Sequence, residues 1–260
     1  MNDVIAYVLF GVFGLCIGSF LNVVIYRLPL GMSLAKPDSH CTKCNYFLKW
    51  YDNIPVLSYI MLGGKCRKCK SPISPRYMLV EIFTCLCFLA CALLFWKNNP
   101  VYAVISALVC CSLICIFFID LEHLYIPDRF HVIIAALGVI AIFFDDFTLW
   151  YDHLIGLGVG GGVFLIIYCA AVLILKKEGL GFGDVKFAFA VGLFLGWQKF
   201  LFSILLASIV ACLVLIPVKH LKKDENGKEY PFGPFLSLGA FVALLFGANI
   251  ITWYISLLTF

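Results

Sequence analysis

Apolar segments long enough to cross a lipid bilayer recur along the whole of this chain of 260 residues. The residues are 63% hydrophobic and 13% charged, whereas soluble domains carry about 25% charged residues. A run of roughly 20 apolar residues spans the hydrocarbon core as a helix, which satisfies its own backbone hydrogen bonds there. The sequence therefore predicts an all-α fold, a polytopic membrane helix bundle embedded in a lipid bilayer.

We expect about eight transmembrane helices, at residues 4–26, 78–96, 101–120, 130–148, 153–175, 185–197, 199–218 and 233–258. The first has neither a basic start nor a small-residue cleavage site, which favours a retained helix over a signal peptide. Four alternate loops hold all Lys and Arg residues except Lys97 and Lys199, which predicts that these loops face the cytoplasm. They are residues 27–77, 121–129, 176–186 and 219–231. The net charge of +4 follows from this topology and indicates no nucleic-acid partner.

One cytoplasmic loop, residues 27–77, is long enough to fold separately, and it contains two CxxC pairs. Cys41 and Cys44 form the first pair, and Cys66 and Cys69 form the second. This spacing is typical of a four-cysteine zinc ribbon, and thiols stay reduced in the cytosol. We therefore expect a structural Zn²⁺ whose four sulfur ligands leave no position for water. A metal-free or redox-active loop is the alternative.

Two aspartates stand at the cytoplasmic ends of predicted helices. Asp120 ends an inward-running helix, and Asp184, which follows Gly181 and Gly183, precedes an outward-running one. A charge near hydrocarbon costs about 2.5–3.5 kcal/mol, so each carboxylate calls for a functional explanation. Two close carboxylates in a poorly solvated site share one proton, as in aspartic proteases. The pair predicts activation of water for attack on a peptide carbonyl.

Other small or polar residues in the apolar segments have simpler interpretations. Gly18 and Asn22 in the first helix, and Gly156 and Gly160 in the fifth, are typical of close helix packing. Asp128 follows Pro127 and is predicted to cap the next helix.

The chain resembles the bacterial type IV prepilin peptidases, membrane aspartyl proteases of the GxGD type. The matching segments are residues 18–29, the two CxxC pairs, 73–77 with Val80 and Glu81, 120–128, 181–186 and 231–235. Met78 departs from the proline that the pattern leads us to expect. The resemblance implies that Asp120 and Asp184 cleave the basic leader of prepilins or pseudopilins after a glycine, at the cytoplasmic face of the bacterial inner membrane. It also implies that the new N-terminus is methylated from S-adenosylmethionine.

The resemblance further suggests a division of the chain and a set of substrate contacts. Residues 1–26 would be the first transmembrane helix, 27–77 a cytoplasmic zinc-binding loop associated with methylation, and 78–260 a seven-helix membrane peptidase domain. The residues expected to position the substrate are Gly181, Gly183, Lys186, Glu122 and Asp128. The glycines would let the substrate backbone approach the acids, and we expect a bulky side chain at Gly183 to do more harm than one at Gly181.

Two functions of other classes are also compatible with some of these features. A transporter or channel could use Asp120 and Asp184 as an ion path, although no further carboxylate layer continues across the membrane. A non-enzymatic zinc-ribbon scaffold would explain the cysteines but would leave Asp184 without a role.

Overall fold

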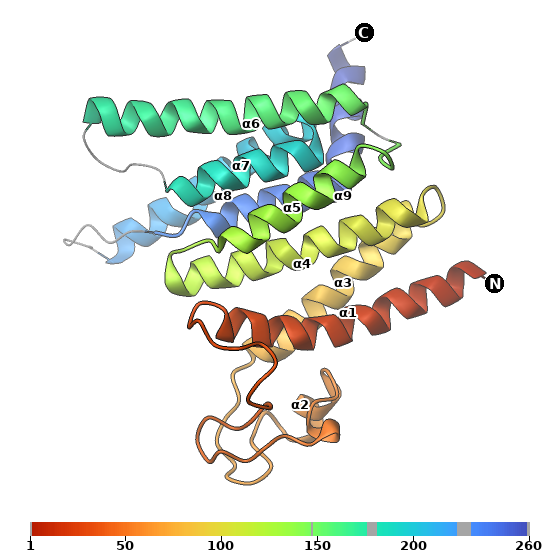
Figure 1. The fold of residues 1–260 in the computed structure, drawn as a ribbon, viewed down its shortest axis with the longest axis vertical. Helices are drawn as coiled ribbons and strands as arrows, with labels where there is room; N and C mark the ends of the chain where they lie inside the picture. Colours follow the sequence, from red (N-terminus) through yellow and green to blue (C-terminus); the bar gives the residue numbers. More distant parts are fainter. Residues whose placement is uncertain (1, 147, 176–180, 223–229, 259–260) are drawn as a thin grey trace. The chain divides into compact units, whose positions relative to one another are not determined.

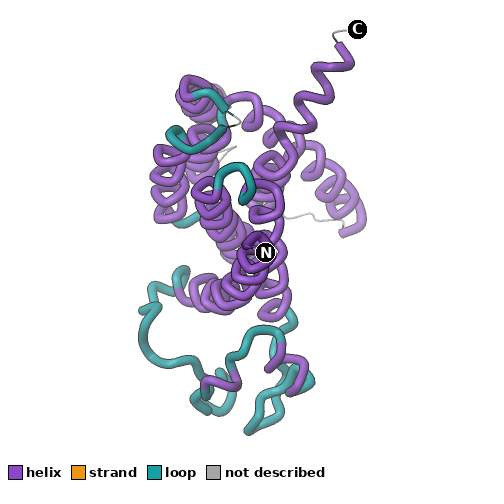
Figure 2. The backbone as a smooth tube through the Cα atoms, turned by 90° about the vertical axis from the view of Figure 1, so that its right-hand side faces the viewer, coloured by secondary structure: helices purple, strands orange, loops and turns teal. Residues whose placement is uncertain are grey.

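The computed structural model describes residues 2–146, 148–175, 181–222 and 230–258, which form two compact units, Met1–Lys97 and Asn98–Phe260 (Figure 1). The described residues contain helices and loops but no β-strand (Figure 2), which confirms the all-α prediction. Gly179, in the predicted loop before Asp184, lies outside the described residues. The helix at 76–95 belongs to the same unit as the first helix, whereas the predicted peptidase domain began at residue 78 and included it.

The first unit is built on two helices, α1 (Asn2–Arg27) and α3 (Arg76–Phe95), which pack against each other. A Cβ atom on Gly18 would lie 2.8 Å from the Cα of Glu81, so only glycine permits this approach. The side-chain amide of Asn22 donates a hydrogen bond of 2.9 Å to the carbonyl of Tyr77. These contacts confirm the helix-packing interpretation of Gly18 and Asn22.

The loop between α1 and α3 carries only two short helical elements, η1 (Trp50–Asp52) and α2 (Leu57–Met61). It is fixed to α3 by Glu81, whose buried carboxylate accepts a 2.7 Å hydrogen bond from the backbone N–H of Val56. Val56 has a φ of 61°, an unfavourable conformation for a β-branched residue. The hydrogen bond to Glu81 therefore holds a strained turn in place.

The second unit contains six longer helices with α7 at their centre. In chain order these are α4 (Pro100–His123), α5 (Asp128–Ala141), α6 (Trp150–Ala170) with its π-helical extension η2 (Ala171–Leu175), α7 (Phe182–Leu195), α8 (Trp197–Lys222) and α9 (Gly233–Leu258). The helices α4, α5, α7 and α6 follow one another side by side (Figure 1). Most residues of α7 are buried, since it also contacts α8 and α9.

Six helices are long and apolar enough to cross a membrane, namely α1, α3, α4, α6 with η2, α8 and α9. The helices α5 and α7 have 14 residues each, about 21 Å, which is shorter than the hydrocarbon core of about 30 Å. Each of the eight predicted ranges thus contains a helix, while the number of complete spans stays a prediction. The predicted range 130–148 was too long, because α5 ends at Ala141.

Glycines allow α6 and α7 to pack closely. A Cβ atom on Gly160 would lie 2.7 Å from the carbonyl oxygen of Ala188, and one on Gly156 would collide with the carbonyl of Gly192. Because these glycines face another helix rather than an open loop, the prediction of small-residue helix contact is confirmed.

A buried ionic cluster joins four segments at the end of the unit where α6 and α8 begin. The ammonium of Lys199 contacts the carboxylate of Asp145 at 3.4 Å and donates to the hydroxyl of Thr148 at 2.7 Å. His153 Nδ1 donates to the carbonyl of Leu193 at 2.9 Å, and its Nε2 lies 3.7 Å from Asp145. The side chains of Asp145 and His153 are fully buried, so each depends on these partners for its polar contacts.

Candidate active site

The two predicted catalytic aspartates lie at one end of the second unit. The last turns of α4 and the first turns of α5, α7 and α9 come together there (Figure 1). Asp120 is 6% exposed and Asp184 is 9% exposed, so both carboxylates are largely withdrawn from solvent. Glu122, two residues beyond Asp120, is exposed.

Asp120 is held by the beginning of α9. Its Oδ2 accepts a buried hydrogen bond of 2.9 Å from the backbone N–H of Gly233, the first residue of that helix. The first N–H groups of a helix have no partner within it, and the helix dipole favours negative charge at this end. A Cβ atom on Gly233 would lie 2.6 Å from Asp120 Oδ2, so the contact requires glycine.

Asp184 belongs to the first turn of α7 rather than to the loop before it. Its backbone N–H donates to the carbonyl of Gly181 at 3.0 Å, and the helix begins at Phe182. A carboxylate in the first turn is stabilised by the dipole of its own helix. Ile126, in the segment that follows Asp120, lies against Gly183, the residue directly before Asp184. The structure therefore brings together two carboxylates that are 64 positions apart in the chain, Asp120 and Asp184.

The glycines before Asp184 provide space rather than an unusual backbone. Gly181 has a φ of −67°, which any residue adopts. A Cβ atom there would lie 3.4 Å from Asp184 Oδ2, whereas one on Gly183 would lie 3.6 Å from the Cβ of Ile126. A side chain at position 181 would thus border the carboxylate itself. The geometry therefore favours greater harm from a substitution at Gly181 than at Gly183, whereas the sequence led us to expect the reverse.

Asp128 and Lys186 form an ion pair between the first turns of α5 and α7. The Lys186 ammonium donates to Asp128 Oδ1 at 2.7 Å and holds the pKa of this exposed carboxyl below its usual value. The same ammonium lies 5.1 Å from the centre of the Phe182 ring. The prediction that Asp128 is the N-cap was wrong, because Pro127 occupies that position and the carboxylate reaches α7 instead.

Gly233 is the site residue that the sequence reasoning missed. The segment 231–235 was recognised as part of the family resemblance, but no role was assigned to Gly233. The available signal was a glycine directly before Pro234 at a helix N-terminus, since such an end is an anion-binding position. What the sequence could not supply is which carboxylate occupies it.

The four predicted zinc ligands converge in the first unit. The sulfur atoms of Cys41 and Cys69 are 3.8 Å apart, those of Cys44 and Cys66 are 3.9 Å apart, and all four lie within 4.8 Å of one another. Four Zn–S bonds of about 2.3 Å in a regular tetrahedron require S–S separations of about 3.8 Å. The donor set therefore fits one zinc ion and leaves no position for substrate or water.

The two CxxC loops have the same backbone geometry. The N–H of Cys41 bonds to the carbonyl of Tyr46, and the N–H of Cys66 bonds in the same way to Ser71. Asn45 and Lys70, each four residues after the first cysteine of its pair, have positive φ values of 53° and 59°. The backbone N–H of Lys43 is the main cause that lowers the pKa of the Cys41 thiol to about 6, which favours a thiolate at this position. At Cys44 the backbone N–H of Tyr46 also lowers the pKa, but burial and the three neighbouring sulfur atoms outweigh it and raise the pKa to about 11.

A salt bridge ties the second CxxC loop to η1. The guanidinium of Arg67 donates to Asp52 Oδ1 at 2.6 Å. Burial alone would raise the pKa of Asp52, but the hydrogen bonds from Arg67, the Lys49 backbone and Tyr46 outweigh it and leave this pKa below its usual value. The ribbon is thus ordered by side chains as well as by its cysteines.

A buried aspartate pair in one helical unit and a four-cysteine cluster in the other define a class of membrane protein with one carboxylate site and one metal-binding site. Comparison with known families places the chain within this class. Residues 12–95 match the bacterial peptidase A24 N-terminal domain, and residues 107–216 match the type IV leader peptidase family. The two matches fall within the two structural units.

Curated relatives cover almost the whole chain. Proteins named prepilin leader peptidase/N-methyltransferase are 35% identical in Aeromonas hydrophila, over 94% of this chain and 92% of the relative, and 34% identical in Pseudomonas aeruginosa, over 93% and 91%. One from Myxococcus xanthus is 39% identical over 85% of this chain and 67% of its own length. No solved structure matches the chain. The chain belongs to the type IV leader peptidase family.

Proposed function

We propose that this protein is an aspartic endopeptidase that removes the basic leader of type IV prepilins or pseudopilins, with Asp120 and Asp184 as its catalytic pair. The observation that carries the proposal is that these two buried carboxylates lie at one end of the second unit. Asp120 accepts a hydrogen bond from the first residue of α9, and Asp184 lies in the first turn of α7. The family membership and the relatives' names support the same substrate class.

The surroundings of the two carboxylates suggest different starting roles. Asp120 accepts the N–H of Gly233, which favours its ionised form. Asp184 lies under the influence of that charge, so it retains the shared proton. Asp120 then takes a proton from water as the water oxygen attacks the peptide carbonyl carbon, and Asp184 gives its proton to the carbonyl oxygen. When the C–N bond breaks, Asp120 returns its proton to the leaving amine and Asp184 recovers one from the tetrahedral intermediate.

The exposed residues around the pair are suited to receiving the substrate. Glu122 and Asp128 offer negative charge to a basic leader, and Lys186 would exchange its present bond to Asp128 as the leader binds. Gly181 and Gly183 leave room beside Asp184 and Ile126 for an extended peptide. Since nearly all basic residues lie in alternate loops that include this end of the helices, the site faces the cytoplasm.

The test is cleavage of a purified prepilin by the full chain in detergent. Asp120→Asn and Asp184→Asn should each reduce the rate by about 10³-fold or more, because neither carboxylate can act as both acid and base. Asp128→Asn should reduce it far less. Near wild-type cleavage by either of the first two variants, with unchanged thermal unfolding, would contradict the assignment. An ion path would instead leave no cleavage in the wild-type protein.

A second activity, N-methylation of the new N-terminus from S-adenosylmethionine, is favoured by the double names of the relatives. We assign methylation to residues 1–97, the unit that contains the cysteine cluster and lies outside the match to the type IV leader peptidase family. Mass spectrometry of the cleaved product, after incubation with an isotopically labelled methyl donor, should find one methyl group on its terminal amine. Cleaved but unmethylated product would show that this chain is a peptidase alone.

A further inference from the structure

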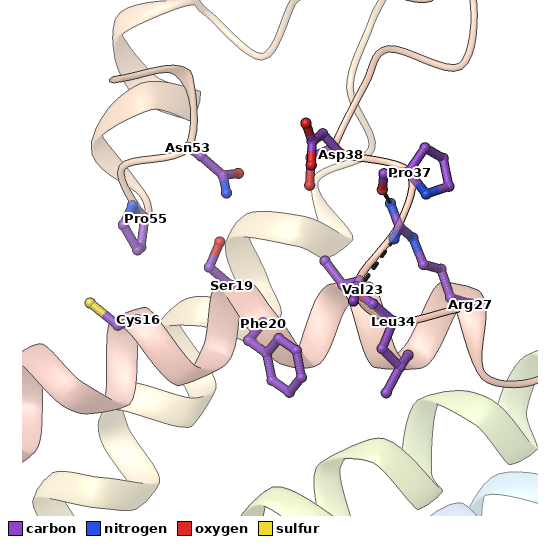
Figure 3. A pocket seen from close by; sticks show the side chains of 12 residues that line it. Cys16, Ser19, Phe20, Val23, Arg27, Leu34, Pro37, Asp38, Asn53 and Pro55 are labelled. Carbon is purple, nitrogen blue, oxygen red and sulfur yellow. Dashed lines mark hydrogen bonds between the residues drawn. The ribbon is translucent and has the colours of Figure 1, made fainter. Parts of the chain in front are cut away.

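The first unit contains a cavity of about 380 Å³ between the last turns of α1 and two segments of the ribbon loop, residues 34–39 and 53–55 (Figure 3). Its volume lies within the range of roughly 300–1,000 Å³ that is typical of small-molecule sites. A cavity in the second unit, lined by Trp197 and Lys199 among others, has only about 130 Å³. The larger cavity is separate from the cysteine cluster, since none of the four ligands lines it.

One wall of the cavity is fixed by Arg27 at the end of α1. This guanidinium is 6% exposed and donates to the carbonyls of Ser33, Leu34 and Pro37, the last at 2.7 Å. These three hydrogen bonds fix the segment 33–37, so Arg27 is a positioning residue.

The opposite wall is fixed by Glu81. Its hydrogen bond to the N–H of Val56 holds the turn that follows Asn53 and Pro55. Both walls are therefore anchored by buried charged side chains on α1 and α3. A cavity whose walls are fixed before a ligand arrives loses little conformational entropy on binding.

The lining combines one negative group, Asp38, and one positive group, Arg27, with neutral polar groups and an apolar wall. Asp38 and Asn53 lie across the cavity from Ser19 of α1 (Figure 3), and Val23 and Leu34 contribute apolar surface. Asp38 is exposed and is the only carboxylate in the lining. These groups match a ligand that carries charges of both signs, hydroxyl groups and an apolar ring.

We infer that this cavity binds the methyl donor S-adenosylmethionine, an inference that rests on the proposed methylation. The donor's sulfonium and ammonium groups are positive and are attracted by Asp38, its carboxylate is negative and matches the charge of Arg27, and Asn53 and Ser19 can pair with its ribose hydroxyls and adenine. When bound, the donor supplies an electrophilic methyl group: the neutral amine forms the new C–N bond, the C–S bond breaks with its electron pair left on sulfur, and the resulting ammonium releases a proton to water.

The experiment measures donor binding by the full chain in detergent, without any prepilin. Isothermal titration with S-adenosylmethionine and with its uncharged-sulfur product S-adenosylhomocysteine should find one site for each. Ala35→Trp, at an exposed residue of the lining, should fill the cavity and weaken both ligands at least tenfold. Asp38→Asn should weaken the positively charged donor by about tenfold, the effect of losing one charge-assisted hydrogen bond, and the product less.

Matched controls separate this inference from the two proposed activities. Asp3→Asn makes the same chemical change at an exposed residue at the other end of α1 and should bind like wild type. Asp184→Asn should bind the donor normally although it cannot cleave. Ultraviolet crosslinking of labelled donor should mark a peptide within residues 16–55.

The inference is overturned if Ala35→Trp and Asp38→Asn bind both ligands as tightly as wild type, or if the crosslinked peptide falls within residues 98–260. It is also overturned if a preparation that methylates cleaved product binds neither ligand. Failure of the proposed methylation looks different, because the donor would bind at the cavity while no methyl group reached the product.

Discussion

Each of the two aspartates makes a hydrogen bond with the backbone of a glycine. Asp120 accepts the N–H of Gly233, and Asp184 is joined through its own N–H to the carbonyl of Gly181. Both neighbours are glycines, but for different reasons. Gly233 lies so close to Asp120 that no Cβ fits, whereas Gly181 only keeps the space beside Asp184 open. Gly233 therefore determines the position of the Asp120 carboxylate, and Gly181 determines how much space is open beside the Asp184 carboxylate.

We predict that Gly233→Ala abolishes prepilin cleavage. The new Cβ would lie 2.6 Å from Asp120 Oδ2, closer than any normal contact, so the carboxylate must move and lose its hydrogen bond. Loss of a correctly placed base reduces the rate by about 10²–10⁴-fold. Cleavage kinetics provide the measurement, and Gly158→Ala is the control because open space surrounds that position on α6. Equal activity of the two variants would exclude a positioning role for Gly233.

The two glycines before Asp184 should respond differently to alanine. Gly181→Ala places a methyl group 3.4 Å from Asp184 Oδ2 and should lower kcat by about tenfold, because water and substrate then compete with it for that oxygen. Gly183→Ala meets only Ile126 at an ordinary distance and lies within α7, where alanine is favoured over glycine by about 1 kcal/mol. It should retain cleavage and unfold at a higher temperature. Steady-state kinetics and thermal unfolding of both variants test the ranking.

At the scale of elements, the sequence predicts what depends on local pattern and misses what depends on partners. The long apolar runs located the long helices among the described residues, and the CxxC spacing located a cluster whose sulfur atoms do converge. The burial of α7 arises from its contacts with α5, α6, α8 and α9, which the segment 185–197 alone does not encode. For the same reason Asp128 was taken as a cap although its partner, Lys186, lies on another helix.

The ribbon is predicted to contain about one zinc per chain when the protein is purified without chelator. Removing the metal should expose the loop, because its short helical elements alone are too small to hold it. Metal analysis and the rate of trypsin cleavage after Lys65 or Lys68 are the measurements. Cys69→Ser should lose zinc, and Cys212→Ser, at an exposed residue of α8, should retain it. A wild-type protein that is metal-free yet resistant to trypsin would contradict this prediction.

The ionic cluster at the far end of the second unit should contribute to stability rather than to catalysis. Lys199→Met removes the ammonium that contacts Asp145 and leaves a buried carboxylate, which costs about 3–5 kcal/mol. The unfolding temperature in detergent should fall, and adding Asp145→Leu should recover part of the loss. Lys97→Met, in an exposed loop, is the control. If Lys199→Met left the unfolding temperature unchanged, the cluster would not be a stabilising element.

For the whole molecule, the placement of the two sites in separate units bears on how the two activities depend on each other. Residues 98–260 contain the aspartate pair, and residues 1–97 contain the cysteine cluster and the cavity beside α1. A change confined to one unit alters the packing of that unit first, because most contacts of each helix are made within its own unit. Damage to one site should therefore leave the chemistry of the other largely intact.

The corresponding prediction is a double dissociation. Asp184→Asn should lose leader cleavage but still methylate a synthetic peptide that begins with the mature N-terminus, because its amine is already free. Cys69→Ser should keep cleavage within a few-fold of wild type, since that thiol is remote from the aspartates in sequence and belongs to the other unit, while methylation falls to background. Mass spectrometry of both substrates with a labelled donor measures the two reactions in one sample. If Cys69→Ser lost both activities while its unfolding temperature stayed unchanged, the ribbon would take part in peptide hydrolysis directly. Cleavage and methylation would then not be confined to separate units.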